Sequence, residues 1–443
     1  MKKRSIALFM AMMLGATALG GCGDAGNDKS QEKSAKQSEA SGEQVEITFY
    51  STQAGVDNET VALLDEFTKE NPDIKVEFLP CGDDQLQAWL GLYAAKKAPT
   101  VALMDVSVVT QYHSYFYNFS ENEVPWVDDI VTGKEYYTVD GSLYAIPASV
   151  QGFGLMYNNR VLKEVFGEDF DIHSVDTRDE LEKMLDDIDA SGKAASTITL
   201  NADWALAAHL GALLYSGYQG DETAQMAFID SLKKGEASLA DDQVYNDLMD
   251  TLDILSEHNM NKADPLQINQ EMNCEAFATG KVATYFQGDW NWMMMSGVEG
   301  RDEELGMIPL PISNDSEQNV GLPMSSPKGY CIDASQNTEE QQAAGLKLVE
   351  WLCNSEKGQD FMGVTIGSTL PFKDVKVENP NALAKSTQEY MEKGEIKDIR
   401  TFTVNVPSDY WYVVGPYFQQ YVAGELDRQG LAKEIESYWT SLE

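Results

Sequence analysis

Three short stretches decide the fold of this chain: VEITFYS (45–51), DIKVEF (73–78) and TVALMD (100–105). In the first two stretches apolar and polar residues alternate, which is typical of strands with one buried face, and the third is continuously apolar. Apolar residues recur at helical spacing over 61–67 and 86–93. Strand–helix–strand–helix–strand in this order predicts an α/β unit with a parallel sheet.

Polar residues stand where the first and third predicted strands end. Tyr50, Ser51, Thr52 and Gln53 close the first strand, and Asp105 closes the third. In open α/β sheets the ligand crevice lies beyond the carboxyl ends of the strands. These residues are therefore the first candidates for a binding site.

The composition excludes several classes of protein. The 443 residues contain 72 acidic and 32 basic side chains, for a formal charge of −40, with 43% hydrophobic and 23% charged residues. This balance is typical of a globular protein and excludes a disordered or fibrous one. At roughly 100–200 residues per domain, the length allows two or three domains. Nucleic acid is not an expected partner, because phosphate binding needs clustered lysine and arginine.

The N-terminus has the pattern of a bacterial lipoprotein signal. Three basic residues precede an apolar run from Ile6 to Leu19, which is shorter than the ~20 residues that cross a bilayer, and no later segment is long enough. The run ends in Leu-Gly-Gly-Cys22. We expect a signal peptide at 1–21, lipidation of Cys22, and a polar tether over 22–45 that holds the protein at a membrane. A plain secretory signal with an incidental cysteine is the alternative.

The other cysteines and the histidines do not predict a metal site, and we expect no cofactor. Cys81, Cys274, Cys331 and Cys353 have mostly apolar neighbours and no CxxC spacing, so buried thiols are expected, with one disulfide as the alternative. The segment 187–192 imitates the start of an EF-hand. Its twelfth position is isoleucine where a bidentate glutamate is required, so calcium is not expected there.

The rest of the chain adds helices and short strands. Residues 170–300 are expected to be mainly helical, with a capping box at Thr177 and Glu180 and a further helix beginning at Trp204. Strands are expected at 305–311 and 329–333. Helices are expected at 339–352 and 355–362, and the C-terminal part is helical and rich in aromatic residues.

Two aromatic clusters lie beside turns. GDWNW (288–292) contains Trp290, and NVPSDYWYVV (405–414) contains Trp411 and Tyr412. Aromatic runs of this kind commonly pack in a core. Tryptophan, tyrosine and acidic residues near turns also make sugar pockets, in which indole rings lie against the sugar and carboxylates bind its hydroxyls.

Six segments in order give the chain a family resemblance: ITFYS (47–51), EFTKENPDIKVEF (66–78), DGSLYAIPASVQGFGLMYNNRVL (140–162), FATGKVATYFQGDWNW (277–292), LGMIPLP (305–311) and GYCIDASQNTEEQQAAGLKLVEWLCNSEKGQDFM (329–362). Over roughly 46–440 the chain resembles the solute-binding lipoproteins of ABC sugar importers, the family that includes maltose-binding protein. The resemblance implies a two-lobe α/β fold of the periplasmic-binding-protein type II, with a hinge and a ligand cleft between the lobes. Lobe 1 would hold 46–148 and 312–368, and lobe 2 would hold 149–311 and 369–443.

The resemblance also implies site residues. Trp290 and Trp411, the latter with Tyr412, match sugar-stacking positions, Asp105 matches a hydroxyl-binding acid, and Gln151 stands where maltose-binding protein has a glutamate. Weaker matches are Tyr330, Trp204, Tyr50, Ser51 and Gln53, for which core packing or turn formation is the alternative role.

The function implied is that of a non-enzymatic receptor. It would capture a carbohydrate, in particular an oligosaccharide, and deliver it to an ABC permease as a lipid-anchored monomer on the outer face of a Gram-positive membrane. Three alternatives remain open: the same fold binding a polyamine or other small solute, a surface carbohydrate-active enzyme with two carboxylates in the cleft, and an adhesin or sensor partner without transport.

Overall fold

The structure, a computed structural model, describes residues 44–53, 55–81, 85–122, 124–407 and 409–442. The predicted signal peptide, Cys22 and nearly all of the predicted tether lie outside the described residues. None of the described helices combines the length and the apolar character needed to cross a membrane.

The first sheet contains, within the described residues, five strands in the order β2-β1-β3-β12-β6. Their bounds are β1 Val45–Ser51, β2 Ile74–Pro80, β3 Val101–Asp105, β6 Ile146–Pro147 and β12 Lys328–Ile332. β1 pairs in parallel with β2 and β3, as the sequence predicts, and β12 pairs antiparallel to β3 with Lys328 opposite Asp105. The carboxyl ends of β1 and β3 therefore meet the first residue of β12.

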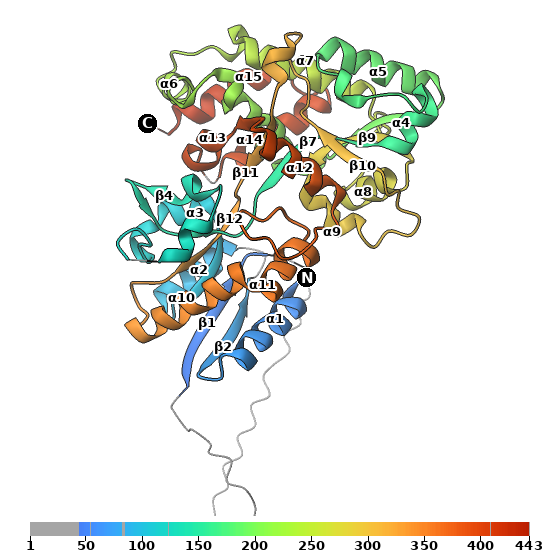
Figure 1. The fold of residues 1–443 in the computed structure, drawn as a ribbon. Helices are drawn as coiled ribbons and strands as arrows, with labels where there is room; N and C mark the ends of the chain where they lie inside the picture. The colour runs from blue at the N-terminus through green and yellow to red at the C-terminus, as the bar shows by residue number, and fades with distance from the viewer. Residues whose placement is uncertain (1–43, 54, 82–84, 123, 408, 443) are drawn as a thin grey trace, which may run out of the picture. The chain divides into compact units, whose positions relative to one another are not determined.

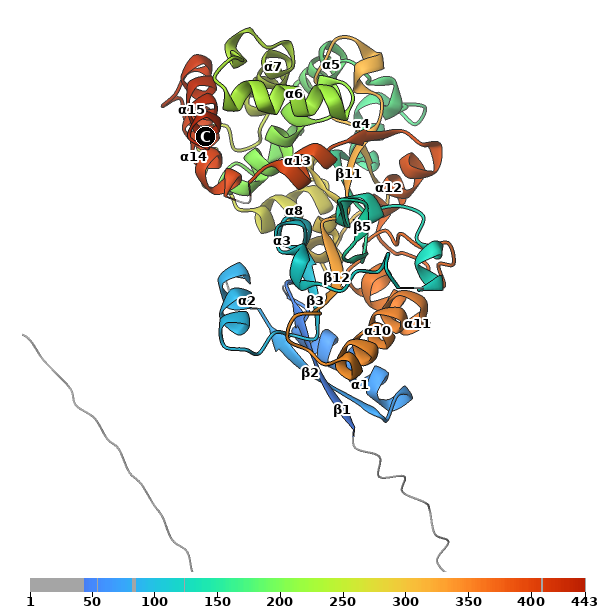
Figure 2. The same cartoon turned by 90° about the vertical axis from the view of Figure 1, so that its left-hand side faces the viewer.

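Helices cover both faces of this sheet (Figures 1 and 2). α1 (Asp57–Glu70), α10 (Glu339–Asn354) and α11 (Glu356–Asp360) lie on one face, and α2 (Gln85–Ala94) lies on the other. α1 buries Leu63, Leu64 and Phe67, which are spaced as the helical pattern requires, and α2 buries Trp89. Each such side chain stabilises the fold by roughly 1.5–3 kcal/mol through apolar burial.

The second sheet runs in the order β13-β11-β7-β9-β8, and β10 pairs antiparallel with β7. The bounds are β7 Gln151–Asn158, β8 Ala194–Ile198, β9 Val282–Gly288, β10 Leu305–Ile308, β11 Leu322–Ser325 and β13 Ile396–Asp398. Every residue of β9 is buried, since the strand lies inside the sheet and both its faces are covered. The segment 312–368 contributes β11 to this sheet and β12 to the first sheet. A small hairpin joins β4 (Thr138–Val139) to β5 (Ser142–Leu143).

The remaining helices belong mainly to the part of the chain that forms the second sheet (Figure 1). They are α3 Val106–Gln111, α4 Asn159–Phe166, α5 Arg178–Ala190, α6 Glu222–Lys233, α7 Gln243–Glu257, α8 Gln270–Ala278, α9 Trp292–Met295, α12 Ala382–Lys393, α13 Arg400–Asn405, α14 Tyr410–Val422 and α15 Arg428–Thr440. α3 is the exception, because it follows β3 directly and packs in the core of the first sheet.

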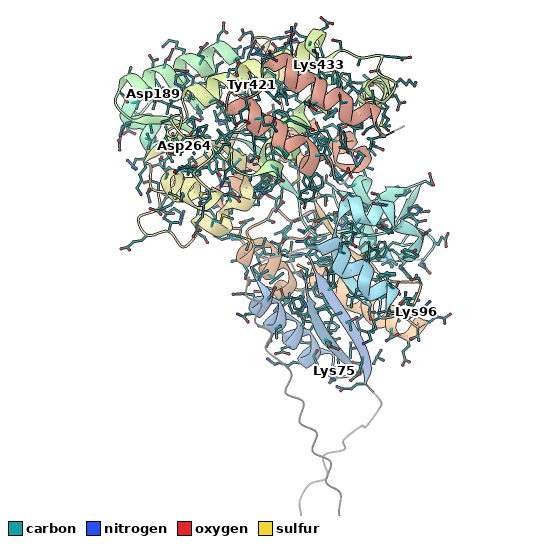
Figure 3. The ribbon with its side chains drawn as sticks, turned by 180° about the vertical axis from the view of Figure 1, so that it is seen from behind. Lys75, Lys96, Asp189, Asp264, Tyr421 and Lys433 are labelled. Carbon is teal, nitrogen blue, oxygen red and sulfur yellow. The ribbon has the colours of Figure 1, made fainter. Side chains whose placement is uncertain are left out.

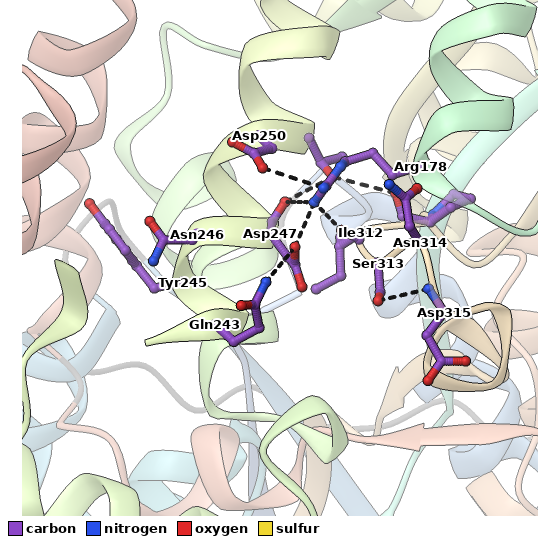
Figure 4. A network of polar contacts seen from close by, with 12 residues as sticks. Arg178, Gln243, Tyr245, Asn246, Asp247, Asp250, Ile312, Ser313, Asn314 and Asp315 are labelled. Atoms are coloured by element: carbon purple, nitrogen blue, oxygen red, sulfur yellow. Dashed lines mark hydrogen bonds and ion pairs between the residues drawn. The ribbon is translucent and has the colours of Figure 1, made fainter. Parts of the chain in front are cut away.

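A polar network ties two of these helices to the segment that follows β10 (Figure 4). Arg178, at the start of α5, donates to Asp247 Oδ1 of α7 at 2.7 Å and to the Ile312 carbonyl at 3.0 Å. Asp250 Oδ2 lies 3.4 Å from the same guanidinium. Charge-assisted bonds in a mostly buried position hold their partners more firmly than exposed ion pairs do.

Several sequence predictions can be compared with these elements. The strands at 45–51, 74–78 and 101–105 are confirmed, and so is the capping box in which Thr177 and Glu180 satisfy each other's backbone amides. The helix expected to begin at Trp204 is instead a π-helix, Ala205–Leu210. The four described cysteines are free thiols, and Cys81 is half-buried whereas the other three are buried.

Candidate functional site

A cavity of about 620 Å³ lies at the carboxyl ends of β1 and β3. It is lined by Thr52, Gln85, Leu86, Gln87, Met104, Asp105, Ser107, Val108, Asp409, Trp411 and Tyr412. The first eight residues come from the strand ends of the first sheet and from α2 and α3, and the last three come from the start of α14. The volume lies in the range of small-molecule sites, roughly 300–1,000 Å³.

Asp105 is fixed in this cavity by a lysine. Lys328 Nζ donates to Asp105 Oδ1 at 2.6 Å, to Thr52 Oγ1 at 2.9 Å and to the Thr52 carbonyl at 3.2 Å. The Asp105 side chain remains 42% exposed. One ammonium group thus holds together the ends of β1 and β3 and the start of β12.

Trp411 is held in the cavity wall by its buried neighbour. Tyr410 is fully buried, its hydroxyl lies 2.9 Å from the Tyr215 hydroxyl, and its ring packs edge-on against Phe402. Because successive helical residues point about 100° apart, Trp411 packs against the edge of the core that Tyr410 enters, and Tyr412 points away from it. Tyr412 is 65% exposed, and Trp411 is half-buried.

A second aromatic group surrounds Trp290. The His209 ring lies 4.6 Å from the Trp290 ring and meets Trp204 edge-on at 5.4 Å. Burial lowers the pKa of His209 to about 3, so its imidazole is neutral. Trp290 folds back over Gly288, where a Cβ atom would lie about 2.1 Å from the indole, so only glycine permits this ring position. π-helical turns such as the one that carries His209 occur frequently at functional sites.

This aromatic group is connected to the cavity through α14. The helix packs against Ala205–Leu210, and the backbone of α14 at Gly415 approaches Asp203 so closely that a Cβ atom there would lie 2.5 Å from the Asp203 carbonyl oxygen. The structure therefore brings Trp411 into the cavity wall and places Trp204 and Trp290 in the adjoining group.

Asp289 directly precedes Trp290 in the chain and is 1% exposed. Its Oδ2 accepts from the Thr387 hydroxyl at 2.8 Å and from the Gly152 amide at 3.1 Å, while its Oδ1 is buried without a hydrogen-bond partner among the described residues. Burial raises the pKa of this carboxyl to about 7. The carboxyl joins β7, α12 and the turn that carries Trp290.

The other predicted site residues lie outside the cavity wall. Gln151 begins β7 and donates to Ser368 Oγ at 3.4 Å. Gln53 donates to the sulfur of Met293 at 3.8 Å, and Ser51 Oγ accepts from the Gln53 amide, which is a turn role. Tyr50 and Tyr330 are 1% and 2% exposed within the first core, so the core-packing alternative applies to both.

Sequence reasoning missed several residues of this region. Asp409 lies within the aromatic cluster at 405–414 and Lys328 directly precedes the segment 329–362, but neither was named as a site residue. Gln85 and Ser107 lie on helices near the expected strand ends. The register of β12 against β3 would have found Lys328, but that pairing spans 223 residues along the chain. His209 contacts both Trp204 and Trp290. The histidines are scattered along the sequence, so no local pattern indicated this contact.

The arrangement offers groups that can bind a small polar solute. Indole rings supply apolar faces, while carboxylate, hydroxyl and amide groups supply fixed hydrogen-bond partners, as in pockets for small polar solutes. Within the described residues, no group of three or more histidine, cysteine or acidic side chains is placed to hold a metal ion.

Solved structures share this fold at low sequence identity. RafE in complex with raffinose is 18% identical with a TM-score of 0.72, over 90% of this chain and 100% of that one. Maltose-bound MalE3 of T. maritima is also 18% identical, with a TM-score of 0.70 and the same coverage. A Bacillus licheniformis sugar transporter in complex with stachyose is 18% identical with a TM-score of 0.67, again over 90% and 100%.

The same two-lobe α/β fold therefore describes this chain. A search of curated proteins finds no match. A family described as "Bacterial extracellular solute-binding protein" matches residues 62–393, well over half of the chain. On that match, the protein belongs to the bacterial extracellular solute-binding proteins.

Proposed function

We propose that this protein binds a carbohydrate, in particular an oligosaccharide, in the cavity at the carboxyl ends of β1 and β3. The observation that carries the proposal is the meeting of Trp411 and Asp105 in one cavity of about 620 Å³. An indole face and a fixed carboxylate are the two partners that a pyranose needs, one for its C–H face and one for its hydroxyls. Trp290 and Trp204 would extend the stacking surface toward a longer ligand.

The structural neighbours support a sugar as the ligand class. Three of these structures are complexes with raffinose, maltose and stachyose, and a further neighbour is a chitin oligosaccharide binding protein. We infer a ligand of the same chemical class here, whereas the particular sugar depends on the positions of Asp105 and Gln85 in the cavity wall.

The proposal extends to the protein's place in transport. The receptor would close its two lobes around the sugar and release it to an ABC permease, as a monomer anchored by lipidated Cys22 to the outer face of a Gram-positive membrane. The two sheets are the centres of the proposed lobes. Lobe 1 would hold 46–148 and 312–368, and lobe 2 would hold 149–311 and 369–443. Within 312–368, β12 pairs in the first sheet, whereas β11 pairs in the second.

Tryptophan fluorescence tests the proposed ligand class. The mature domain is titrated with raffinose, stachyose, maltose, chitooligosaccharides and spermidine. A saturable change with one of the sugars, weakened in Trp411→Ala, is the expected result. A response to spermidine alone would replace the sugar with a polyamine, and no response to any sugar would contradict the proposal.

A further inference from the structure

Lys328 differs from the other lysines that form ion pairs, because it makes its contacts beside the cavity. Its side chain is 20% exposed, and it lies at the first residue of β12, opposite Asp105 in the sheet register. An exposed pair on the same sheet, Lys75 with Glu46 at 2.7 Å, lies near the opposite ends of the strands (Figure 3).

The lysine ammonium group has no hydrogen-bonding capacity left for a ligand. An ammonium carries three N–H donors and no acceptor. The three acceptors at Asp105 Oδ1, Thr52 Oγ1 and the Thr52 carbonyl, at 2.6, 2.9 and 3.2 Å, use all three donors. Lys328 therefore acts on the cavity through its charge and through the position that it gives to Asp105.

Lys328 also leaves one oxygen of the Asp105 carboxylate available to a ligand. Asp105 Oδ1 is bound to Lys328, whereas Oδ2 makes no hydrogen bond to the described residues. A carboxylate pinned at one oxygen presents the other in a fixed direction, which suits a hydroxyl donor at one place on a ligand.

Lys328 also changes the net charge around the cavity. Among the lining residues the ionisable carboxylates are Asp105 and Asp409, and the Tyr438 hydroxyl donates to Asp409 at 2.8 Å. Lys328 offsets the charge of Asp105 at contact distance. Without this lysine, a ligand would meet the carboxylates of Asp105 and Asp409, and the described lining residues include no cation.

We propose that Lys328 is a specificity-determining residue that makes this cavity select neutral polyhydroxylated ligands and reject organic cations. Lys328 positions Asp105 Oδ2 for a hydroxyl and cancels the negative charge that would attract a polyamine. The choice of ligand class rests on the proposed function, but the rejection of cations does not.

The experiment compares binding of spermidine and of raffinose, stachyose and maltose by calorimetry, using the mature domain. The variants are Lys328→Met, the double variant Lys328→Met/Asp105→Asn, and Lys75→Met as the matched control. We expect Lys328→Met to bind spermidine at least about tenfold more tightly than the wild type and to bind the sugar about tenfold more weakly. The double variant should lose the gain for spermidine, and Lys75→Met should match the wild type.

The outcomes separate this inference from the proposed function. If none of the sugars binds the wild type but spermidine affinity follows the expected pattern, the role of Lys328 stands and the proposed function fails. If a sugar binds the wild type and Lys328→Met equally, and spermidine affinity does not change, the role of Lys328 is overturned while the proposed function stands. Should Lys328→Met fail to fold, Lys328→Gln makes the same change in charge while retaining hydrogen-bond donors for Thr52.

Discussion

The two sides of the candidate site differ in the side chains that form them: the first sheet contributes polar groups, and the second sheet with its helices contributes aromatic rings. The first sheet supplies strand ends at which Lys328 donates to both Thr52 and Asp105 through short polar contacts. The second sheet and its helices supply rings, with His209 between Trp204 and Trp290 and a buried tyrosine behind Trp411. A polar side fixes which hydroxyls are accepted, whereas an aromatic side contributes area that many sugars can use.

The difference between the polar and the aromatic side indicates which side should supply affinity and which should supply specificity. Aromatic side chains bury 150–250 Å² each and dominate binding energies, so the second side should carry most of the affinity. Each hydrogen bond exchanges a bond with water for a bond with protein and contributes about 1 kcal/mol net, but a mismatched polar group costs more. The first side should therefore determine discrimination among ligands.

The largest expected effect is the pH dependence of stability that Asp289 gives to the aromatic side. Asp289 directly precedes Trp290 in the chain. Burial raises the pKa of the Asp289 carboxyl from 3.8 to about 7 in the folded protein. The folded state thus binds this proton more tightly than the unfolded state does, so the stability contribution is complete below about pH 4 and is lost as pH rises toward 7. A rise of this size corresponds to roughly 4 kcal/mol.

Urea unfolding of the wild type and Asp289→Asn between pH 4 and 8 measures this effect. The stability of the wild type relative to the variant should fall across that range, because other titrating groups cancel in the difference. Parallel pH curves for the two proteins would mean that Asp289 does not titrate in this range.

Removal of the indole at 290 comes next in size. Trp290→Ala should weaken sugar binding by about 2 kcal/mol, since the ring offers a large apolar face next to His209 and Trp204. Trp351→Ala is the matched control, because Trp351 is a half-buried tryptophan that packs on Phe67 and donates to Glu70. Equal sugar affinity in Trp290→Ala and the control would show that the aromatic group is core alone.

Trp411 should contribute somewhat less. It stands at the exposed start of α14, so Trp411→Ala should cost about 1 kcal/mol of binding without unfolding the protein. Val413→Ala, two residues further along the same helix and exposed, provides the comparison in calorimetry. A larger loss in Val413→Ala than in Trp411→Ala would place the ligand on another face of α14.

Gln151 should give the smallest effect. Its amide makes one long bond, 3.4 Å to Ser368, and lies outside the cavity wall. Gln151→Ala should change sugar affinity by less than about 0.5 kcal/mol, because it removes at most a weak contact. A loss of 1.5 kcal/mol or more in the same titration would mean that β7 takes part directly in binding.

Local patterns in the sequence predicted the first sheet well. The alternation in VEITFYS and the helical spacing up to Phe67 are short-range signals, and the structure confirms both. The strands β8 and β9 were not predicted, because short apolar runs such as VATYFQG do not distinguish a buried strand from a buried helix. Only the surrounding sheet settles their state.

The residues of the candidate site could be predicted only in part, because some of them come together through the pairing of distant strands. Trp411 and Asp105 were named from motif positions, and they meet in one cavity. Tyr50 and Tyr330 were named from the same motifs, yet their rings point into the core, because the face of a strand residue depends on register. Lys328 required the pairing of distant strands, which no local pattern contains.

The pairing of β12 with β3 also governs when the protein can complete its fold. Lys328 follows Asp105 by 223 residues, so β3 has no partner on that edge until most of the chain exists. At roughly 5–20 residues per second, synthesis of that interval takes about 10–45 seconds. Non-local pairing slows folding, and an open strand edge invites association with other chains. Until the segment that contains β12 has been made, β3 lacks this partner and the edge of the first sheet is incomplete.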